Sequence, residues 1–326
     1  MEVLILTEGG GKIGFGHITR CIALCEAFEE KDINPELLVN GDSSILDLLR
    51  LKNFQRFDWV KNEERLFKIL TNSDFIIIDS YLAEKSLYNK ISEMTDGRIL
   101  VIDDYNRIDY PKGIVVNPSI YGDKLNYSRK SDTIYLLGKD YIILRKEFWN
   151  VPEKKINKKV KNVLITFGGN NNYDLANKIV NFLEKKFDFR FYLVNAKNNK
   201  TAKEMLNLML ESDVCISGGG QTTYELARVG VPTIGVCFAE NQLGNLKSWG
   251  KVGLLKNAGW FNDKKLFQKV EEIFNELDYE SRLKMYEIGK KYIDGQGVKR
   301  ILKKILEKIG NYKNGVIKDE NTFLRR

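Results

Sequence analysis

Short apolar runs alternate with segments of helical periodicity, and this alternation restricts the fold more than any other feature. The runs in the first half cover residues 3–6, 37–39, 75–78 and 99–102. Between the first two, apolar residues recur at helical spacing at Ile18, Cys21, Ile22, Cys25 and Phe28. Strands that consist of continuous apolar residues are typical of parallel sheets covered by helices on both faces. The first half therefore predicts an α/β domain.

The second half repeats this alternation. Apolar runs recur at 163–167, 189–194, 214–216 and 233–236, and the segment 264–309 is helical in pattern and strongly charged. Residues 151–162 contain Pro152 and five lysines, a composition typical of a solvated linker. A chain of 326 residues has room for two domains. We predict two Rossmann-type parallel-sheet α/β domains facing a central cleft, over 1–150 and 163–295, followed by a C-terminal helix and polar tail over 296–326.

A glycine-rich turn, residues 9–16, follows the first predicted strand. Backbone N–H groups and a helix N-terminus converge at such a turn, which suits phosphate. Gly9, Gly11 and Gly14 satisfy G-x-G-x-x-G, but the turn continues to Gly16 before the helical pattern begins. The second strand also lacks a terminal acid. Because the match is incomplete, an NAD enzyme is disfavoured but stays as an alternative. The absence of G-x-x-x-x-G-K-[ST] disfavours a P-loop NTPase.

The only histidine in the chain, His17, stands between this turn and the first predicted helix. We expect the glycines to leave its ring accessible. The positive end of the helix disfavours imidazolium, and a neutral imidazole is a good general base. The alternative is a structural or surface histidine. A Ser-His-Asp hydrolase is not supported, because no G-x-S-x-G occurs.

A second glycine turn, Gly218-Gly219-Gly220, precedes a predicted helix that starts at Thr222. Thr222 and Glu225 have the spacing of a capping box, which needs no ligand. Capping does not require three consecutive glycines, whereas close approach of a large anion to the backbone does benefit from them. We therefore favour ligand binding at this turn.

The remaining composition excludes several classes. The four cysteines form no C-x-x-C pair and are expected to be buried packing residues, with a zinc site as the alternative. We expect no metal and no cofactor.

The formal charge of +8 comes largely from lysines mixed with glutamates, so we expect no nucleic-acid partner. With no export or membrane segment evident, we expect a cytoplasmic protein without membrane insertion. The oligomeric state stays open, and a monomer is compatible with the sequence.

Taken together in chain order, the motifs resemble the nucleotide-sugar hydrolases of the pseudaminic acid pathway, the related spore-coat polysaccharide proteins and, more distantly, GT-B glycosyltransferases. The resemblance runs through most of the chain. It is carried by Gly14-Phe15-Gly16-His17 within 13–21, by Ile102-Asp103-Asp104, by Asp294-Gly295-Gln296-Gly297 with Arg300, and by the segments 78–81, 137–145, 147–148, 166–170, 218–225 and 239–242.

The resemblance implies a GT-B fold and the metal-independent hydrolysis of a UDP-linked 2,4-diacetamido-2,4,6-trideoxy hexose to UDP and free sugar. It implies His17 as the base that activates water, in the N-terminal domain, and uridine nucleotide binding mainly by the C-terminal domain. The residues implied for the sugar are Gly14, Gly16, Arg20, Tyr81, Asn241 and Gln242. Those implied for the nucleotide are Gly168, Gly169, Asn170, Gly219, Gly220, Gln221 and Thr222, with Glu225 accepting the ribose hydroxyls.

Two alternatives remain. A GT-B glycosyltransferase would use the same donor site, with His17 deprotonating an acceptor hydroxyl instead of water. A non-enzymatic protein that binds anions or nucleic acid is suggested only by the net charge. The first turn also differs from the family pattern, because Glu8-Gly9-Gly10 stands where Asp or Ser is expected, and the difference bears on which sugar is bound.

Overall fold

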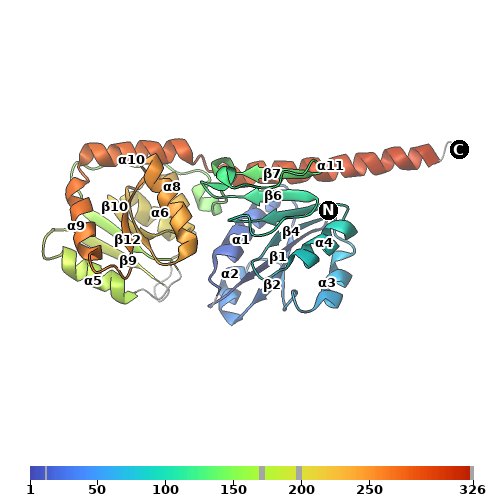
Figure 1. Cartoon of the computed structure of the whole chain (residues 1–326), viewed down its shortest axis with the longest axis horizontal. Helices are drawn as coiled ribbons and strands as arrows, with labels where there is room; N and C mark the ends of the chain where they lie inside the picture. Colours follow the sequence, from blue (N-terminus) through green and yellow to red (C-terminus); the bar gives the residue numbers. More distant parts are fainter. Residues whose placement is uncertain (12, 169–172, 196–199, 324–326) are drawn as a thin grey trace. The chain divides into compact units, whose positions relative to one another are not determined.

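The computed structural model describes residues 1–11, 13–168, 173–195 and 200–323. The chain divides into two compact units (Figure 1). Unit 1 contains Met1–Ile143 and Gln296–Arg326, and unit 2 contains Leu144–Gly295. The chain thus enters unit 2 once and returns to unit 1 at its C-terminal end.

Seven parallel strands form the sheet in the described part of unit 1. They are β1 (Val3–Gly9), β2 (Glu36–Gly41), β3 (Phe54–Arg56), β4 (Phe75–Asp79), β5 (Ile99–Ile102), β6 (Gly113–Asn117) and β7 (Thr133–Leu137). Their order is β3-β2-β1-β4-β5-β6-β7. The chain runs outward from β1 in one direction and then in the other, so the order reverses between β1 and β4. In open α/β sheets, ligands bind at this switch point, beyond the carboxyl ends of the strands.

Helices cover both faces of this sheet (Figure 1). Helix α1 (Gly16–Glu29) lies on one face, and α3 (Glu63–Leu70) and α4 (Lys85–Met94) lie on the other. The loops of unit 1 contain one short α-helix and three 3₁₀ helices. They are α2 (Leu46–Leu49), η1 (Ser43–Ile45), η2 (Gly122–Lys124) and η3 (Lys139–Tyr141). Every residue of β1, β4, β5 and β6 is buried, which explains why these strands contain apolar runs without alternation.

Five parallel strands form the sheet in the described part of unit 2. They are β8 (Asn162–Thr166), β9 (Arg190–Val194), β10 (Val214–Gly218), β11 (Thr233–Cys237) and β12 (Leu255–Trp260). Their order is β12-β11-β10-β8-β9, which reverses between β8 and β10. Two parallel-sheet α/β units confirm the predicted fold class.

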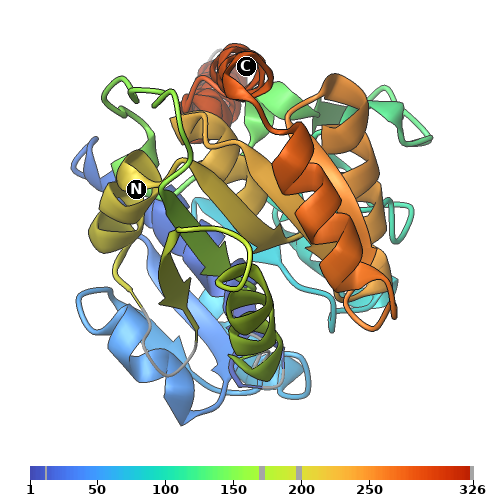
Figure 2. The ribbon, with the colours of Figure 1, turned by 90° about the vertical axis from the view of Figure 1, so that its left-hand side faces the viewer.

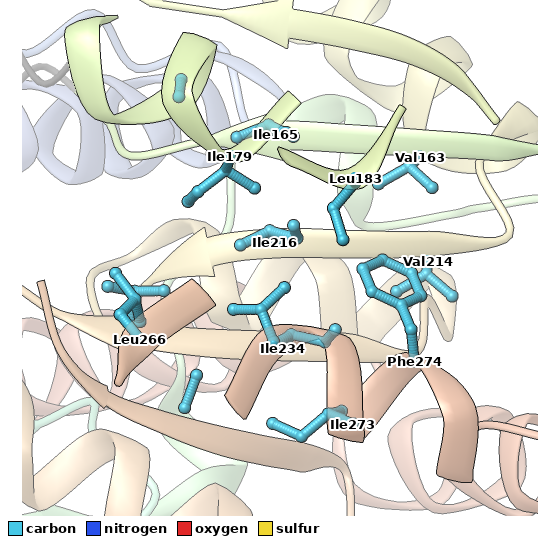
Figure 3. Close-up of a cluster of buried hydrophobic side chains, with 14 of the residues drawn as sticks. Val163, Ile165, Ile179, Leu183, Val214, Ile216, Ile234, Leu266, Ile273 and Phe274 are labelled. Atoms are coloured by element: carbon cyan, nitrogen blue, oxygen red, sulfur yellow. The ribbon is translucent and has the colours of Figure 1, made fainter. Parts of the chain in front are cut away.

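One short helix of unit 2, η4, precedes its first strand, and the others follow the strands. The helices are η4 (Lys146–Phe148), α5 (Tyr173–Leu183), α6 (Ala202–Glu211), α7 (Thr222–Val229), η6 (Glu240–Gln242), α8 (Leu243–Val252), α9 (Leu266–Glu276) and α10 (Tyr279–Tyr292). In Figure 2, α5 and α9 lie on the near face of the sheet. Figure 3 shows Ile179 and Leu183 of α5 and Phe274 of α9 packed against Ile165, Ile216 and Ile234 of the strands. Burial of these side chains supplies much of the free energy that keeps the helices on the sheet.

Most of the segment 151–162 is exposed, as its composition predicts, but one of its lysines is not. Lys154 is buried, and its Nζ donates to the carbonyl oxygens of Met209 and Leu210 at 3.1 and 2.7 Å. Arg282 donates to the carbonyl oxygens of Asn157 and Lys158, each at 2.9 Å. The last carbonyls of a helix lack partners within the helix and attract cations, so the end of α6 accepts Lys154. The segment is therefore part of unit 2.

The C-terminal helix α11 (Gly297–Phe323) packs on unit 1, against α1 and η3. Arg300 donates to the carbonyl oxygen of Asp140 at 3.1 Å. Gly297 lies so close to the chain that a Cβ there would be 2.2 Å from the carbonyl oxygen of Ile142. Within the described residues, no helix combines the length and apolar character needed to cross a membrane.

Candidate functional site

His17 and Asp79 form the centre of the site in unit 1. His17 is the second residue of α1, directly after the turn that follows β1, and Asp79 is the last residue of β4. Because β1 and β4 are neighbours, both residues lie at the switch point of the sheet. His17 Nδ1 is 2.6 Å from Asp79 Oδ1, and Asp79 is completely buried. The prediction of an accessible ring is wrong, since His17 is only 7% exposed.

The bond to Asp79 fixes the tautomer of the His17 ring. Burial by itself would raise the pKa of Asp79, but the charge of Arg20 and the hydrogen bonds from Arg20 and His17 outweigh it and hold this pKa far below its usual range. Nδ1 lies 2.6 Å from Asp79 Oδ1 and 3.1 Å from Arg20 Nη2, which can only donate. An ionised carboxylate only accepts hydrogen bonds, so the shorter contact assigns the hydrogen to Nδ1 and the lone pair to Nε2. The carboxylate also stabilises positive charge on the ring, which opposes the effect of the helix N-terminus.

Arg20, one turn further along α1, joins two aspartates. Its Nε and Nη2 donate to Asp79 at 2.5 and 2.6 Å, and its Nη1 and Nη2 donate to Asp104 at 2.7 and 3.0 Å. Arg20 is 7% exposed, so this pair of bidentate contacts is shielded from solvent. Burial opposes the charge of Asp104, but Arg20 lowers the pKa of that carboxyl below its usual range. Arg20 therefore acts from within the cluster and holds both carboxylates in place.

Tyr81 completes the cluster. Its hydroxyl donates to Asp104, and its ring packs edge-on against the His17 ring at a centroid distance of 4.4 Å. Burial, reinforced by Asp104, raises the pKa of the Tyr81 hydroxyl far above its usual range, so it stays protonated. Tyr105 lies beside Tyr81 at 5.4 Å between ring centroids and is 43% exposed. Sequence reasoning missed Tyr105, although it directly follows the acidic pair at the end of β5.

The glycine turn of unit 1 engages three of its described backbone N–H groups within the protein. Gly10 N donates to Gly14 O at 3.0 Å, Gly14 N donates to Gly10 O at 2.7 Å, and Gly11 N donates to Asp42 at 2.9 Å. Gly14 has a φ of +90°, which favours glycine. A Cβ at Gly14 or Gly16 would meet no atom within 4 Å. Gly14 and Gly16 therefore leave open space beside the turn that precedes His17.

Glu8 is a further residue that sequence reasoning left without a role. It is fully buried near the end of β1, accepts from the Ser80 hydroxyl, and accepts from the backbone N–H of Tyr81 at 2.7 Å. The carboxylate thus orients the loop that carries Tyr81. An acid at the end of a buried strand was the available signal.

In unit 2, the second glycine turn lies at the switch point between β8 and β10. Gly219 N donates to Gln242 Oε1 at 3.1 Å, and the same oxygen accepts from Phe238 N at 3.1 Å. A Cβ at Gly219 would lie 2.7 Å from Leu246, whereas a Cβ at Gly220 would meet nothing within 4 Å. Gly219 is therefore required for packing, and Gly220 is the glycine that leaves open space.

Glu225 forms an ion pair instead of a capping box. Its two carboxylate oxygens accept from Arg145 Nε and Nη2 at 2.6 and 2.7 Å. The N-cap residue of α7 is Gln221, which makes no capping bond with its side chain. The capping-box interpretation of Thr222 and Glu225 is thus wrong, because the buried Glu225 pairs with a cation 80 positions earlier.

The other predicted residues are less closely tied to these clusters. Asn241 is exposed in η6. Gly168 follows β8 with a φ of +71°, and a Cβ there would meet nothing within 4 Å. Gly169 and Asn170 lie outside the described residues.

The cysteines are buried and unpaired. They are Cys21, Cys25, Cys215 and Cys237. Burial raises the pKa of Cys25 to about 12. In the described ranges, no three His, Cys, Asp or Glu side chains form a group that could hold a metal ion.

Comparison with curated proteins finds distant relatives along most of the chain. The Bacillus subtilis spore coat polysaccharide biosynthesis protein SpsG is 24% identical, covering 92% of this chain and 96% of that protein. A Helicobacter pylori protein, pseudaminic acid cytidylyltransferase and UDP-2,4-diacetamido-2,4,6-trideoxy-beta-L-altropyranose hydrolase, is 25% identical over 79% of this chain. An uncharacterized Methanocaldococcus jannaschii protein is 25% identical over 72% of this chain. The chain spans 48% of the Helicobacter protein and 55% of the Methanocaldococcus protein.

Solved structures share the fold at low sequence identity. Acinetobacter baumannii MurG superimposes with a TM-score of 0.66 at 13% identity, covering 94% of this chain and 99% of MurG. Arabidopsis thaliana UGT89C1, complexed with UDP-L-rhamnose, gives a TM-score of 0.66 at 13% identity, with 94% and 98% covered. No family model matches the chain. The chain is thus similar to SpsG and to the Helicobacter protein at 24% and 25% identity, and it has the GT-B fold, built from two parallel-sheet α/β units.

Proposed function

We propose that this chain hydrolyses a UDP-linked 2,4-diacetamido-2,4,6-trideoxy hexose to UDP and the free sugar, with His17 as the general base. The observation that carries the proposal is the contact of 2.6 Å between His17 Nδ1 and Asp79 at the switch point of unit 1. A base oriented by a buried carboxylate is suited to remove a proton from water. The relationship to SpsG and to the Helicobacter hydrolase supports the choice of a UDP-sugar substrate.

The reaction requires one proton transfer and one displacement. Water attacks the anomeric carbon while its proton passes to His17 Nε2. The bond between the anomeric carbon and the β-phosphate oxygen breaks, and its electron pair leaves with UDP. Asp79, through Nδ1, holds the ring in the tautomer that leaves Nε2 able to accept the proton.

The charges around His17 favour this proton transfer. Asp79 and Asp104 are ionised and Arg20 is cationic, so the three groups carry a net charge of −1 while the ring is neutral. When His17 takes the proton, the whole cluster becomes neutral. Charges fixed in advance and shielded from water stabilise a developing opposite charge more strongly than solvent does.

The proposal assigns the nucleotide to unit 2. The turn at Gly220 and the N-terminus of α7 would hold the pyrophosphate and stabilise charge on the departing UDP. The side of Gly220 on which a Cβ would stand is open, which supports this assignment. Glu225, held by Arg145, would accept hydrogen bonds from the ribose hydroxyls through its remaining lone pairs.

Incubation with a panel of UDP-sugars in ¹⁸O-water, followed by mass spectrometry, tests the proposal. We expect release of UDP and free sugar without any acceptor, with the label in the sugar and none in UDP, because the new bond forms at carbon. Label in UDP would show attack at phosphorus and contradict the mechanism. Turnover that appears only after an acceptor is added would identify a glycosyltransferase instead.

A further inference from the structure

An aromatic surface lies beside His17. Tyr105 is a large side chain with 43% of its surface exposed, and it lies 5.4 Å from Tyr81, which in turn contacts the His17 ring at 4.4 Å. The three rings thus form a continuous series from the buried base to the surface of unit 1. Tyr105 takes no part in the proton transfer to His17.

The polar group of Tyr81 has a defined direction within this series. Asp104 is ionised and accepts hydrogen bonds, so the Tyr81 hydroxyl is the donor in their contact. Once its hydrogen is engaged, the Tyr81 oxygen can only accept a hydrogen bond from a ligand. A ligand beside it therefore gains most from an N–H or O–H group. An acetamido group provides such an N–H.

We propose that Tyr105 is a specificity-determining residue which, together with Tyr81, forms an aromatic surface that binds the methyl-bearing side of an acetamido-deoxy sugar. This inference rests on the proposed function. The sugar of that substrate carries two acetyl methyl groups and a deoxy methyl group, so it is more apolar than glucose. Contact between such groups and aromatic rings stabilises a complex. Because the surface lies next to His17, a sugar bound there is close to the base.

Kinetics of single variants test the inference. For Tyr105→Ala, with UDP-2,4-diacetamido-2,4,6-trideoxy hexose as substrate, we expect KM to rise about tenfold, as one lost apolar contact predicts, while kcat stays nearly constant. Inhibition by UDP should not change, because UDP has no sugar. Tyr105→Phe should behave as wild type, because it keeps the ring. Tyr312→Ala serves as the matched control, since Tyr312 on α11 is a comparably exposed tyrosine, at 36%.

Two kinetic results would overturn the inference. One is an unchanged KM in Tyr105→Ala, and the other is an equal loss of UDP inhibition, which would indicate general damage. If wild type hydrolyses no UDP-sugar, the proposed function fails, and calorimetry on the same proteins then decides about Tyr105. We expect the sugar to tighten binding relative to UDP in wild type and to do so less in Tyr105→Ala. A sugar that adds no affinity in wild type, or adds as much in the variant, contradicts the assignment.

Discussion

His17 Nδ1 and Asp79 Oδ1 are 2.6 Å apart although 62 positions separate the residues in the chain. The contact exists because β1 and β4 lie side by side at the point where the strand order reverses. It converts an isolated histidine at a helix N-terminus into an oriented base.

Replacement of His17 should remove hydrolysis without removing nucleotide binding. For His17→Asn we expect kcat to fall by about 10²–10⁴-fold, the usual contribution of a general base. The dissociation constant for UDP, measured by calorimetry, should stay within about twofold of wild type, because the base does not contribute to UDP binding. Substantial residual turnover in this variant would contradict the role of His17.

Replacement of Asp79 should lower kcat more than replacement of Asp104. An asparagine at position 79 has one acceptor oxygen where the aspartate has two, so its amide NH₂ would face either Arg20 Nε or His17 Nδ1, both donors. Asp79→Asn should therefore lose the fixed tautomer and lower kcat by about 10²-fold or more. Asp104→Asn is the matched control, because Asp104 contacts Arg20 but not the ring. Circular dichroism should accompany the assay, since breaking a buried ion pair costs about 3–5 kcal/mol of stability. Equal losses of kcat in the two variants would contradict the role of Asp79 in orienting the base.

The two adjacent glycines of unit 2 should respond differently to alanine. Gly220→Ala should fold normally, because its Cβ meets nothing within 4 Å, but should weaken UDP binding where the pyrophosphate is expected. Gly219→Ala should lose about 1–3 kcal/mol of stability, because its Cβ would lie 2.7 Å from Leu246. Thermal unfolding and UDP titration separate the two effects. Unchanged UDP affinity in Gly220→Ala would remove this turn from the nucleotide site.

Glu225 should determine the preference for ribose. If its carboxylate accepts the ribose hydroxyls, wild type binds UDP more tightly than 2′-deoxy-UDP, and Glu225→Gln should reduce this ratio about tenfold, because a charged acceptor is lost. Competition titrations with the two nucleotides measure the ratio. A stability loss with an unchanged ratio would mean that the ion pair with Arg145 is structural only.

Lys154 should make stability depend on pH in the alkaline range. Burial lowers the pKa of Lys154 to about 8 from its ordinary 10.5, so between these values the unfolded chain binds more protons than the folded one. The free energy of unfolding therefore rises with pH across this window, by about 3 kcal/mol at most. Lys154→Met should lack this component. Urea unfolding at pH 7 and pH 10 gives the comparison, and a difference between wild type and variant that does not change with pH would contradict it.

The sequence by itself determined the elements and the type of sheet. Continuous apolar runs such as 75–78 are buried on both faces, and this local property already requires parallel strands under helices. His17 at the start of a helix and acids at the ends of β4 and β5 could also be located, because these positions depend on neighbouring residues only.

Only the tertiary structure decided which of these residues meet. Strand order is set by packing between distant segments, so the sequence did not indicate that Asp79 would orient His17, or that Arg20 would bridge Asp79 to Asp104. The same holds for Glu225, which has the spacing of a capping box but pairs with Arg145. It also holds for Lys154, which the sequence predicts to be solvated but whose ammonium group binds the end of α6. Buried charges need partners, and the fold alone determines which partners are within reach.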